Sequence, residues 1–301
     1  MNPIEAVSEL ALRYLKPEQF VALRSGYMST RKRLAPLICG IYGTFDATKL
    51  RVHLEKRLGT RFEILMVHSS FNHMQPTYTD SPLNLVRMLI DFCGPDRTLV
   101  MPAFYFGDSA FDGAAATFMQ RPRFDLRRTP SQMGLATELF RRSKGVVQSR
   151  HPVYRIAALG PLAERLTRGH EQAESAAGRG SPFEFMAQHD TLIIGMGKFC
   201  DVLTQVHYAE AVLGEAFPVP SRSGPGLTVR VIDGDQEFPV RLRERAFEWR
   251  RNMWKLRTIM DSASLAEWKF HHVPMFATRA ATVTDALIQA AKRGVTLYEK
   301  P

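Results

Sequence analysis

The segment TQVHYAEAV, residues 204–212, contains side chains whose types and spacing suit proton transfer. If the segment is helical, His207 and Glu210 lie three residues apart on one face, where the carboxylate can orient or stabilise the imidazole. An imidazole titrates near neutral pH and can therefore accept a proton from an attacking nucleophile. The pattern predicts His207 as a general base and Glu210 as its orienting partner.

Other interpretations of this segment stay open. An isolated His-x-x-Glu is more often a structural pair on a helix than a catalytic one. The pair can also supply two metal ligands, with His68 or His151 as a third after folding, although no complete metalloenzyme motif accompanies it. Asp201 and Thr204 precede the histidine, and either can cap a helix.

The same segment resembles the signature of the aminoglycoside 3-N-acetyltransferases. Further motifs of that family have counterparts here in the same order: VHSS (67–70), GPDRTLVMPAF (94–104), TPSQMG (129–134), HP followed by AALG (151–160) and GRGSPFEF (178–185). Together the motifs cover about half of the chain. Several motifs in one order are more specific than any single motif, so the resemblance favours a catalytic rather than a structural His207.

The resemblance implies an acyl-CoA-dependent N-acyltransferase, with acetyl-CoA as the first choice of co-substrate and no metal. It implies that His207 takes the proton of an amine as that amine attacks the thioester, with Glu210 and Thr204 in the catalytic set. For the CoA thioester it implies a site made of His68, Ser69, Ser70, Met101, Pro102, Ser149 and His151. For the amino-sugar acceptor it implies Asp201, Arg155 and Tyr208.

The VHSS segment closes an apolar run, so it places Ser69 and Ser70 at the end of a predicted strand. Backbone amides and hydroxyls at such a position can face the thioester carbonyl or the CoA pyrophosphate. A strand-ending turn whose serines satisfy nearby backbone groups is the alternative interpretation.

The acceptor is less well defined than the reaction. Gln148 stands where the family usually has arginine, and Arg155 stands where many members have serine shortly after the His-Pro pair. The chain carries a formal net charge of +10 and has a pI near 9.7, whereas an enzyme that holds polycationic aminoglycosides benefits from carboxylates. We therefore expect an anionic amino sugar, such as a nucleotide-linked sugar of surface-polysaccharide synthesis, with aminoglycosides as the second candidate.

The composition is that of an ordinary globular protein. Its 301 residues, 45% of them hydrophobic, can bury a large core. The three cysteines form no CxxC pair, which argues against a disulfide framework and fits a reducing compartment. The N-terminus lacks the pattern of a signal peptide, and no apolar run approaches the roughly 20 residues that span a bilayer. We expect a cytoplasmic protein without a membrane partner.

The distribution of basic residues tests function classes other than an acyltransferase. The basic residues occur in scattered pairs such as Arg127-Arg128 rather than in one tract, which argues against a nucleic-acid partner. FEWRRNMWKLR, residues 247–257, could stack bases, but a helix with an apolar stripe and solvated arginines explains it equally well. A non-catalytic relative, a basic nucleic-acid-binding protein and a metal-dependent hydrolase are the alternatives, and a homodimer is left open.

The order of predicted elements favours a mixed α/β fold. Residues 1–60 are predicted as a helical peripheral segment, with helices in AVSELALRYL and DATKLRVHLEKRL separated around Gly40 and Gly43. Residues 61–217 are predicted as the motif-bearing core. Its expected strands are FEILMVHSS, TLVMPAF, RIAALG and TLIIGMG, and its expected helices are LNLVRMLIDFCG, MGLATELFRRSKG and FEFMAQHD.

Residues 218–301 complete the predicted organisation. They begin with a hairpin around Asp233-Gly234 and continue into arginine-rich helical sequence, a strand, a capped helix and a last short strand. All three segments are predicted to form one acyltransferase domain, residues 1–301. We expect a central mixed β-sheet flanked by helices, with an additional antiparallel β element toward the C-terminus.

Overall fold

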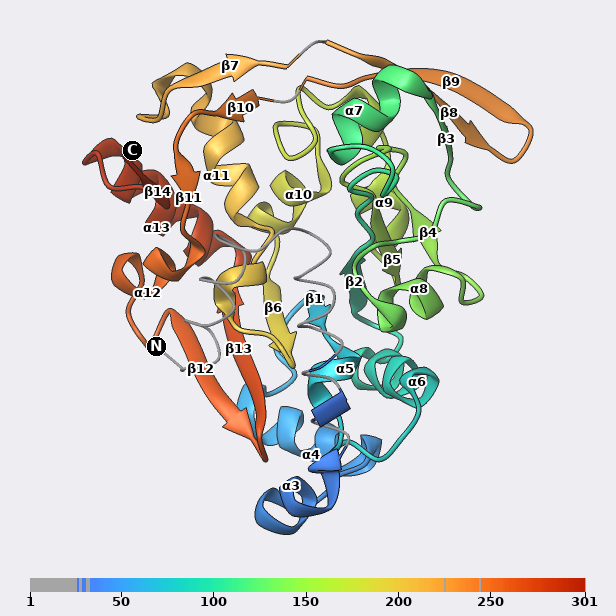
Figure 1. Cartoon of the computed structure of the whole chain (residues 1–301), viewed down its shortest axis with the longest axis vertical. Helices are drawn as coiled ribbons and strands as arrows, with labels where there is room; N and C mark the ends of the chain where they lie inside the picture. The colour runs from blue at the N-terminus through green and yellow to red at the C-terminus, as the bar shows by residue number, and fades with distance from the viewer. Residues whose placement is uncertain (1–25, 27–28, 31–32, 225, 244, 301) are drawn as a thin grey trace.

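A seven-stranded mixed β-sheet, flanked by helices, forms the centre of the computed structural model (Figure 1). The structure describes residues 26, 29–30, 33–224, 226–243 and 245–300, so the helix expected in AVSELALRYL lies outside the described residues. The strand order is β12-β13-β6-β1-β2-β5-β4. The strands are β1 (Ile64–Ser69), β2 (Thr98–Pro102), β4 (Val147–Gln148), β5 (Ile156–Leu159), β6 (Thr191–Met196), β12 (Leu265–Phe270) and β13 (Val273–Arg279).

The middle of this sheet is parallel and its edges are antiparallel. β1 runs parallel to both β2 and β6, whereas β13 pairs antiparallel with β6 and β5 pairs antiparallel with β2. Every residue of β1, β2 and β6 is buried. Strands covered on both faces are apolar along their whole length, which explains the unbroken runs in the sequence. The predicted mixed α/β class is confirmed.

Eleven helical segments are described, together with four short 3-10 turns. The helices are α3 (Ala35–Tyr42), α4 (Ala47–Leu58), α5 (Phe71–Met74), α6 (Pro82–Cys93), α7 (Gly113–Gln120), α8 (Leu135–Arg141), α9 (Ala163–Thr167), α10 (Pro182–Gln188), α11 (Val206–Leu213), α12 (Leu256–Ile259) and α13 (Ala280–Lys292). The 3-10 turns are η1 (His170–Gln172), η2 (Cys200–Val202), η3 (Gly214–Ala216) and η4 (Met253–Lys255).

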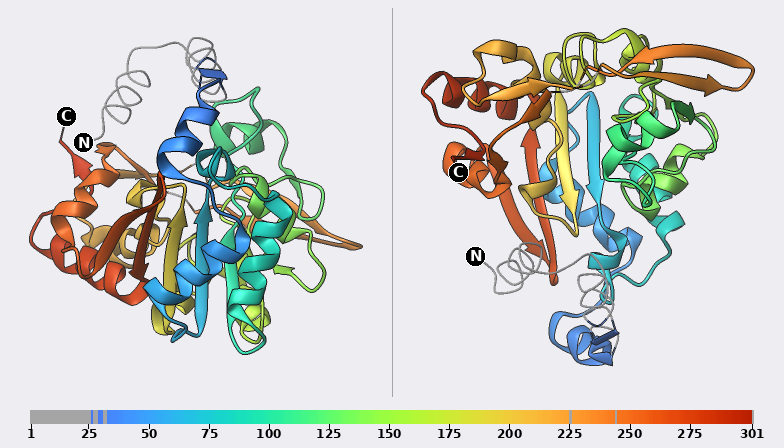
Figure 2. Two further views of the ribbon diagram at one scale, coloured as in Figure 1. Left: turned by 90° about the horizontal axis from the view of Figure 1, so that it is seen from below. Right: turned by 45° about the horizontal axis from the view of Figure 1, so that its top comes forward.

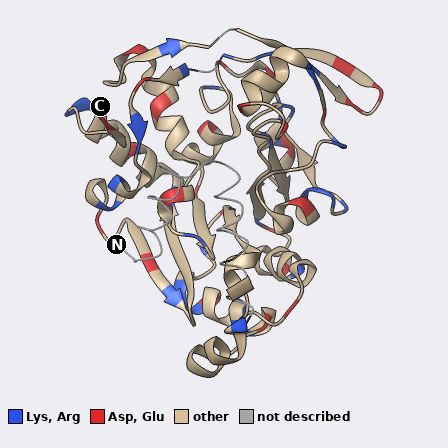
Figure 3. Cartoon of the chain, in the orientation of Figure 1, with Lys and Arg blue, Asp and Glu red and all other residues tan. Residues whose placement is uncertain are grey.

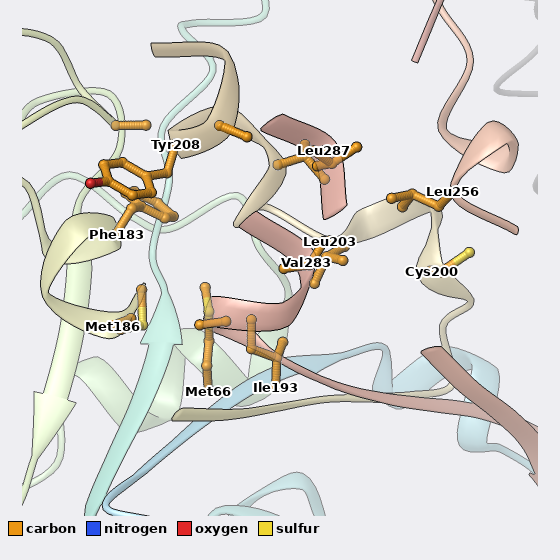
Figure 4. Close-up of a cluster of buried hydrophobic side chains, with 14 of the residues drawn as sticks. Met66, Phe183, Met186, Ile193, Cys200, Leu203, Tyr208, Leu256, Val283 and Leu287 are labelled. Atoms are coloured by element: carbon orange, nitrogen blue, oxygen red, sulfur yellow. The ribbon is translucent and has the colours of Figure 1, made fainter. Parts of the chain in front are cut away.

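The sheet divides the core into two apolar layers. Successive residues of a strand point to opposite faces, so Ile64 and Met66 join one buried cluster while Leu65 and Val67 join the other. The first cluster takes in side chains of α9, α10, α11 and α13, and Figure 4 shows its central members, from Met66 and Ile193 to Val283 and Leu287. The second takes in side chains of α4, α6 and α8. Helix α11 is therefore held by the first layer.

Helix α6 shows how local sequence sets an element's limits. The side chain of Ser81 accepts a hydrogen bond from the backbone N–H of Asn84, and Pro82 occupies the first turn, where a missing N–H costs nothing. Gly94 ends the helix with a φ of 64°, a left-handed conformation that glycine adopts readily. These are the limits that the sequence predicts for LNLVRMLIDFCG.

The C-terminal part contains more strand than the sequence suggested. The helix predicted for the arginine-rich stretch is wrong over most of its length. The stretch forms the strands β10 and β11 before the 3-10 turn η4 and the short helix α12. The smaller sheets pair β3 (Arg123–Asp125) with β8 (Thr228–Asp233) and β9 (Gln236–Arg241), β7 (Ser221–Ser223) with β10 (Arg245–Phe247), and β11 (Arg250–Arg251) with β14 (Tyr298–Glu299). Alternate residues of a strand lie on one face, and the two arginines of RERAF, residues 243–247, have this spacing.

Two further expectations concern turns. The predicted hairpin is confirmed: β8 and β9 pair from Asp233 opposite Gln236, so Gly234 and Asp235 form the two-residue loop. The break expected around Gly40 and Gly43 is confirmed at Gly43, which follows the last residue of α3, Tyr42, and is wrong at Gly40, because α3 runs through that residue. Among the residues that the structure describes, no helix is both long and apolar enough to cross a bilayer. Figure 2 shows the small sheets lying beyond one end of the central strands.

Candidate active site

His207 on α11 lies in the wall between two cavities. The larger, of about 440 Å³, is lined by His207, Tyr154, Thr204 and the end of β1; we call it the sheet cavity. The smaller, of about 260 Å³, is lined by His207, Tyr154, Glu210 and three arginines; we call it the arginine cavity. Because the ring of His207 borders both spaces, it can reach atoms bound in either one.

The sheet cavity opens where the central parallel strands end. Ser69 closes β1, Ser70 follows it, and Pro102 closes the neighbouring β2. Ligands in open α/β sheets commonly bind outside the carboxyl ends of the strands. The side chains of Phe104, Phe106, Met133, Leu135 and Val202 make much of the remaining lining apolar.

Two buried polar side chains of the sheet cavity lack hydrogen-bond partners among the described residues. They are the imidazole of His68, at both ring nitrogens, and the hydroxyl of Thr204. Burial, reinforced by the charge of Lys198, lowers the pKa of His68 to about 3, so the ring is neutral. Buried polar groups are usually paired, so these groups are suited to contact a bound molecule. No side chain caps α11, so the alternative role of Thr204 as a helix cap is not observed.

The end of β1 offers hydroxyls more readily than amides. The backbone N–H of Ser70 donates to the carbonyl of Met196 at 2.9 Å, so this amide is already used within the fold. The side chains of Ser69 and Ser70 line the sheet cavity. Of the donors predicted at the VHSS turn, the hydroxyl groups can therefore face a substrate carbonyl, whereas the Ser70 amide is occupied.

His207 and Glu210 are brought together as the helical spacing predicts, but a third residue joins them. Nδ1 of His207 lies 3.6 Å from Oε2 of Glu210, which is too far for a good hydrogen bond. Arg251 on β11 bridges the pair: Nη1 donates to Nδ1 of His207 at 3.2 Å, and Nη2 donates to Oε2 of Glu210 at 2.5 Å. The Arg251 guanidinium also donates to the hydroxyl of Tyr298.

This bridge determines where the imidazole carries its proton. An arginine has donors only, so Nδ1 of His207 is an acceptor and the neutral ring carries its hydrogen on Nε2. Burial lowers the pKa of His207 below its usual value; Glu210 opposes this shift, and the charge of Arg251 reinforces it. At neutral pH the ring is uncharged, which is the state a general base requires.

Tyr154 is the second residue shared by both cavities. Its ring stacks on Phe104, with centroids 4.4 Å apart, and lies 5.1 Å from the ring of His207. His151 does not line either cavity; instead its Nδ1 accepts hydrogen bonds from the backbone N–H groups of Val153 and Tyr154. His151 therefore shapes the turn that presents Tyr154.

Ser149 is likewise buried outside both cavities. Nε2 of His170 can only donate to the carbonyl of Ala176, at 2.8 Å, so Nδ1 of His170 accepts from the hydroxyl of Ser149 at 2.8 Å. This pairing anchors the loop from Glu174 to Ala177, which borders the arginine cavity. The structure thus gives Ser149 and His151 contacts that support the site, while their predicted contact with CoA stays a prediction.

The remaining predicted residues are distributed around the site. Met101 is fully buried in the second core layer, next to the hydroxyl of Thr137. Arg155 is completely buried and donates to the carbonyls of Ala103, Leu126 and Thr129; burial lowers its pKa to about 9. Tyr208 donates to Glu184, and Asp201 is exposed on η2. None of these four lines either cavity.

Sequence reasoning missed the cationic wall of the arginine cavity. Arg243, Arg245 and Arg251 all line it, with Phe247. They lie more than thirty residues after His207, so no spacing rule could connect them to the base. The one usable signal was the alternation of arginines along 243–247, which places them on one face of a strand.

A metal site receives no geometric support from the described residues, where no group of three His, Cys, Asp or Glu side chains converges as metal ligands would. The predicted pair of ligands, His207 and Glu210, is occupied by the guanidinium of Arg251. His151, one of the two proposed third ligands, is directed to backbone amides. What converges on His207 is a set of hydrogen-bonding groups suited to proton transfer.

The family model for the aminoglycoside 3-N-acetyltransferases matches residues 66–292. The chain belongs to this family. Aminoglycoside N(3)-acetyltransferase IV of a Salmonella species is 31% identical over 164 residues, which cover 52% of this chain and 55% of that protein. Aminoglycoside N(3)-acetyltransferase III of Serratia marcescens is 33% identical over 168 residues, which cover 53% of this chain and 60% of that protein. The chain thus spans little more than half the length of these curated relatives.

Solved structures of aminoglycoside acetyltransferases share the fold. The crystal structure of AAC(3)-Xa superposes with a TM-score of 0.71 at 19% identity, covering 88% of this chain and 99% of that one. AAC-IIIb in a binary complex with CoASH superposes with a TM-score of 0.67 at 20% identity, covering 86% of this chain and all of that one. The family resemblance and the fold predicted from the sequence motifs are both confirmed.

Proposed function

We propose that the protein is an acyl-CoA-dependent N-acyltransferase that acylates the amino group of an amino sugar, with acetyl-CoA as the first donor to test. One observation carries this proposal: His207, a neutral and partly buried imidazole, borders two separate cavities. Two substrates held on either side of one base can react directly in a ternary complex. Membership in the aminoglycoside 3-N-acetyltransferase family and the names of its relatives support the same reaction.

The linings of the two cavities suggest how the substrates divide between them. The sheet cavity suits the thioester arm of the donor, because its walls are largely apolar and its hydroxyls, at Ser69, Ser70 and Thr204, can donate to a carbonyl oxygen. The arginine cavity, with Glu210 and Glu174 as carboxylates, suits the acceptor. The solved relative with bound CoASH shares this fold and supports CoA as the donor's carrier.

In the proposed reaction the amine nitrogen attacks the thioester carbon and a tetrahedral oxyanion forms. The hydroxyls of Ser69, Ser70 and Thr204 stabilise that oxyanion. His207 removes the proton of the attacking amine, the C–S bond then breaks, and the imidazolium gives this proton to the departing sulfur, which leaves as the CoA thiol. The acyl group moves once, from sulfur to nitrogen, so no acyl-enzyme is needed.

Arg251 sets a condition on this proton transfer. With its Nη1 donating to Nδ1, the neutral ring has its hydrogen on Nε2. For Nε2 to accept the amine proton, the ring hydrogen must lie on Nδ1 instead. Glu210, whose Oε2 is 3.6 Å from Nδ1, can accept that hydrogen once Arg251 turns away. We therefore assign Glu210 the role of orienting partner and Arg251 that of holding the resting tautomer.

Thiol release from acetyl-CoA tests the proposal. The purified protein is given an aminoglycoside, glucosamine or a phosphorylated glucosamine, and His207→Ala serves as the variant without a base. We expect acceptor-dependent release of CoA thiol and an N-acetylated product by mass spectrometry. Double-reciprocal plots of the rate against the two substrate concentrations should intersect, as a ternary complex requires. Absence of thiol release with every amine, or unchanged turnover in His207→Ala, would contradict the proposal.

A further inference from the structure

We propose that Arg243 and Arg245 form an anion-binding subsite in the arginine cavity, and that it selects an amino sugar carrying a phosphate group as the acceptor. The inference rests on the proposed function, which assigns the acceptor to this cavity. It also goes further, because acyl transfer to an amine requires no second charged group on the acceptor.

Arg245 and Phe247 lie on β10, and Arg243 stands just before that strand. Side chains two residues apart along a strand point the same way, and Arg243, Arg245 and Phe247 all line the cavity. Ala246 points to the opposite face, where it stands directly across from Arg222 on β7. Figure 3 shows basic segments on β7, β10 and β11, and only the last two of these strands supply arginines to the cavity lining.

The charges in this cavity leave an excess of cation. Arg251 is paired with Glu210 at 2.5 Å, so the two largely neutralise each other. Among the described residues, no carboxylate lies within ion-pair distance of Arg243 or Arg245. Among the described residues of the lining, Glu174, which is exposed, is the other carboxylate. Two arginines facing one glutamate attract an anion and repel a polycation.

The carboxylate of Glu210 offers a contact for the other end of the acceptor, the reacting amine. Oε1 of Glu210 is buried and has no hydrogen-bond partner among the described residues, and Glu210 lines the arginine cavity beside His207. Leaving a buried carboxylate oxygen without a donor is costly, so the group is suited to receive an N–H of the reacting amine. The cavity thus offers a hydrogen-bond acceptor near the base and a pair of cations, Arg245 on β10 and Arg243 just before it.

Chemistry and size favour a phosphate on a single sugar ring. Guanidinium groups bind phosphate through paired N–H donors, and two adjacent arginines match its several oxygens. The cavity volume of about 260 Å³ lies just below the usual range for ligand sites, about 300–1,000 Å³. One sugar ring with its phosphate suits this space, and the arginines of the lining disfavour a polyamine. Anything beyond the phosphate, such as a nucleoside, would extend outside the cavity.

The test compares an unphosphorylated acceptor with two phosphorylated ones. Acetyl transfer is measured with glucosamine, with glucosamine phosphate and with a nucleoside-diphosphate-linked amino sugar. We expect kcat/KM for at least one phosphorylated acceptor to exceed that for glucosamine by about 10- to 100-fold, the range for a charge-assisted contact. In the double variant Arg243→Gln/Arg245→Gln, the ratio of kcat/KM for the phosphorylated acceptor to kcat/KM for glucosamine should fall close to one. The main cause should be a higher KM for the phosphorylated acceptor. Arg222 is exposed on the other face of the ribbon, so Arg222→Gln should keep the wild-type ratio of kcat/KM values.

The two phosphorylated acceptors distinguish a sugar phosphate from a nucleotide-linked sugar. Preference for glucosamine or an aminoglycoside over both, or an unchanged ratio in the double variant, would overturn the subsite. Equilibrium binding of glucosamine phosphate to the wild type and the double variant tests the subsite without turnover. If no amine is acetylated but this binding is lost in the double variant, the proposed function fails and the anion subsite stands. Equal binding by both proteins would overturn the subsite.

Discussion

The two cavities that meet at His207 are built in different ways. The sheet cavity is framed by the ends of β1 and β2, buried strands held by the pairing of the central sheet. The arginine cavity is framed by α11, the loop from Glu174 to Ala177, and the short strands β10 and β11. On the proposed function, the core sheet frames the donor site, whereas the peripheral strands set the charge presented to the acceptor. Substitutions in either cavity, or in the wall that they share, should therefore have distinguishable effects.

The largest effect is expected at the shared wall. His207→Ala should lower kcat by about two to four orders of magnitude, the usual contribution of a general base. The Kd for CoA, measured by calorimetry, should change little, because the variant removes the base without altering the end of β1. His189→Ala, which removes an imidazole stacked on Phe185 outside both cavities, is the matched control. A large loss of CoA affinity in His207→Ala would make the residue part of the donor site instead.

The next largest effect is expected at Glu210, where the contribution to stability and the contribution to catalysis can be measured separately. Glu210→Gln leaves the charge of Arg251 without its partner, and breaking a buried ion pair from one side costs about 3 kcal/mol in the free energy of unfolding. The double variant Glu210→Gln/Arg251→Met should recover most of that stability in urea denaturation, yet remain slow in acetyl transfer. Recovery of turnover together with stability would show that Glu210 acts only as a structural partner of Arg251.

The contact between Arg251 and His207 also predicts how the rate of acetyl transfer depends on pH. His207 works as a base when neutral, so the rate should rise with pH through its pKa, which burial and Arg251 hold below 6.5. Arg251→Gln removes the charge that lowers this pKa and frees Glu210, which raises it. The acid limb of the kcat profile should therefore move to higher pH by about one unit. Movement to lower pH would contradict the assigned electrostatics, and Arg222→Gln should leave the profile unchanged.

The smallest effect is expected in the sheet cavity. Thr204→Val keeps the side-chain shape and removes a buried hydroxyl that has no partner among the described residues. Because the fold loses no hydrogen bond, thermal stability should be unchanged or slightly higher. If the hydroxyl contacts the substrate, turnover should fall about two- to tenfold, the value of one neutral hydrogen bond. Unchanged kinetics would remove Thr204 from the catalytic set, where the family resemblance places it.

Local sequence was sufficient for the elements whose limits depend on neighbouring residues. The cap at Ser81, the proline after it and Gly94 define α6, and an unbroken apolar run defines β1. The helix predicted for 247–257 was wrong over residues 247–252, because arginine and aromatic residues there fit a helix by periodicity alone. In the fold those residues form the end of β10, a bend and β11, and β11 pairs with β14, almost fifty residues later. Such pairing is decided by tertiary contacts and outweighs local preference.

The sequence by itself determined the reacting residues that lie close together along the chain. His207 and Glu210 share a face of α11 because a helix repeats every 3.6 residues, and ordered motifs indicated the family. Only the tertiary structure decided that Arg251 bridges this pair and that Arg243 and Arg245 stand in the same cavity. Those arginines approach the base through strand pairing and packing across a long loop of chain, and sequence spacing carries no information about such distances.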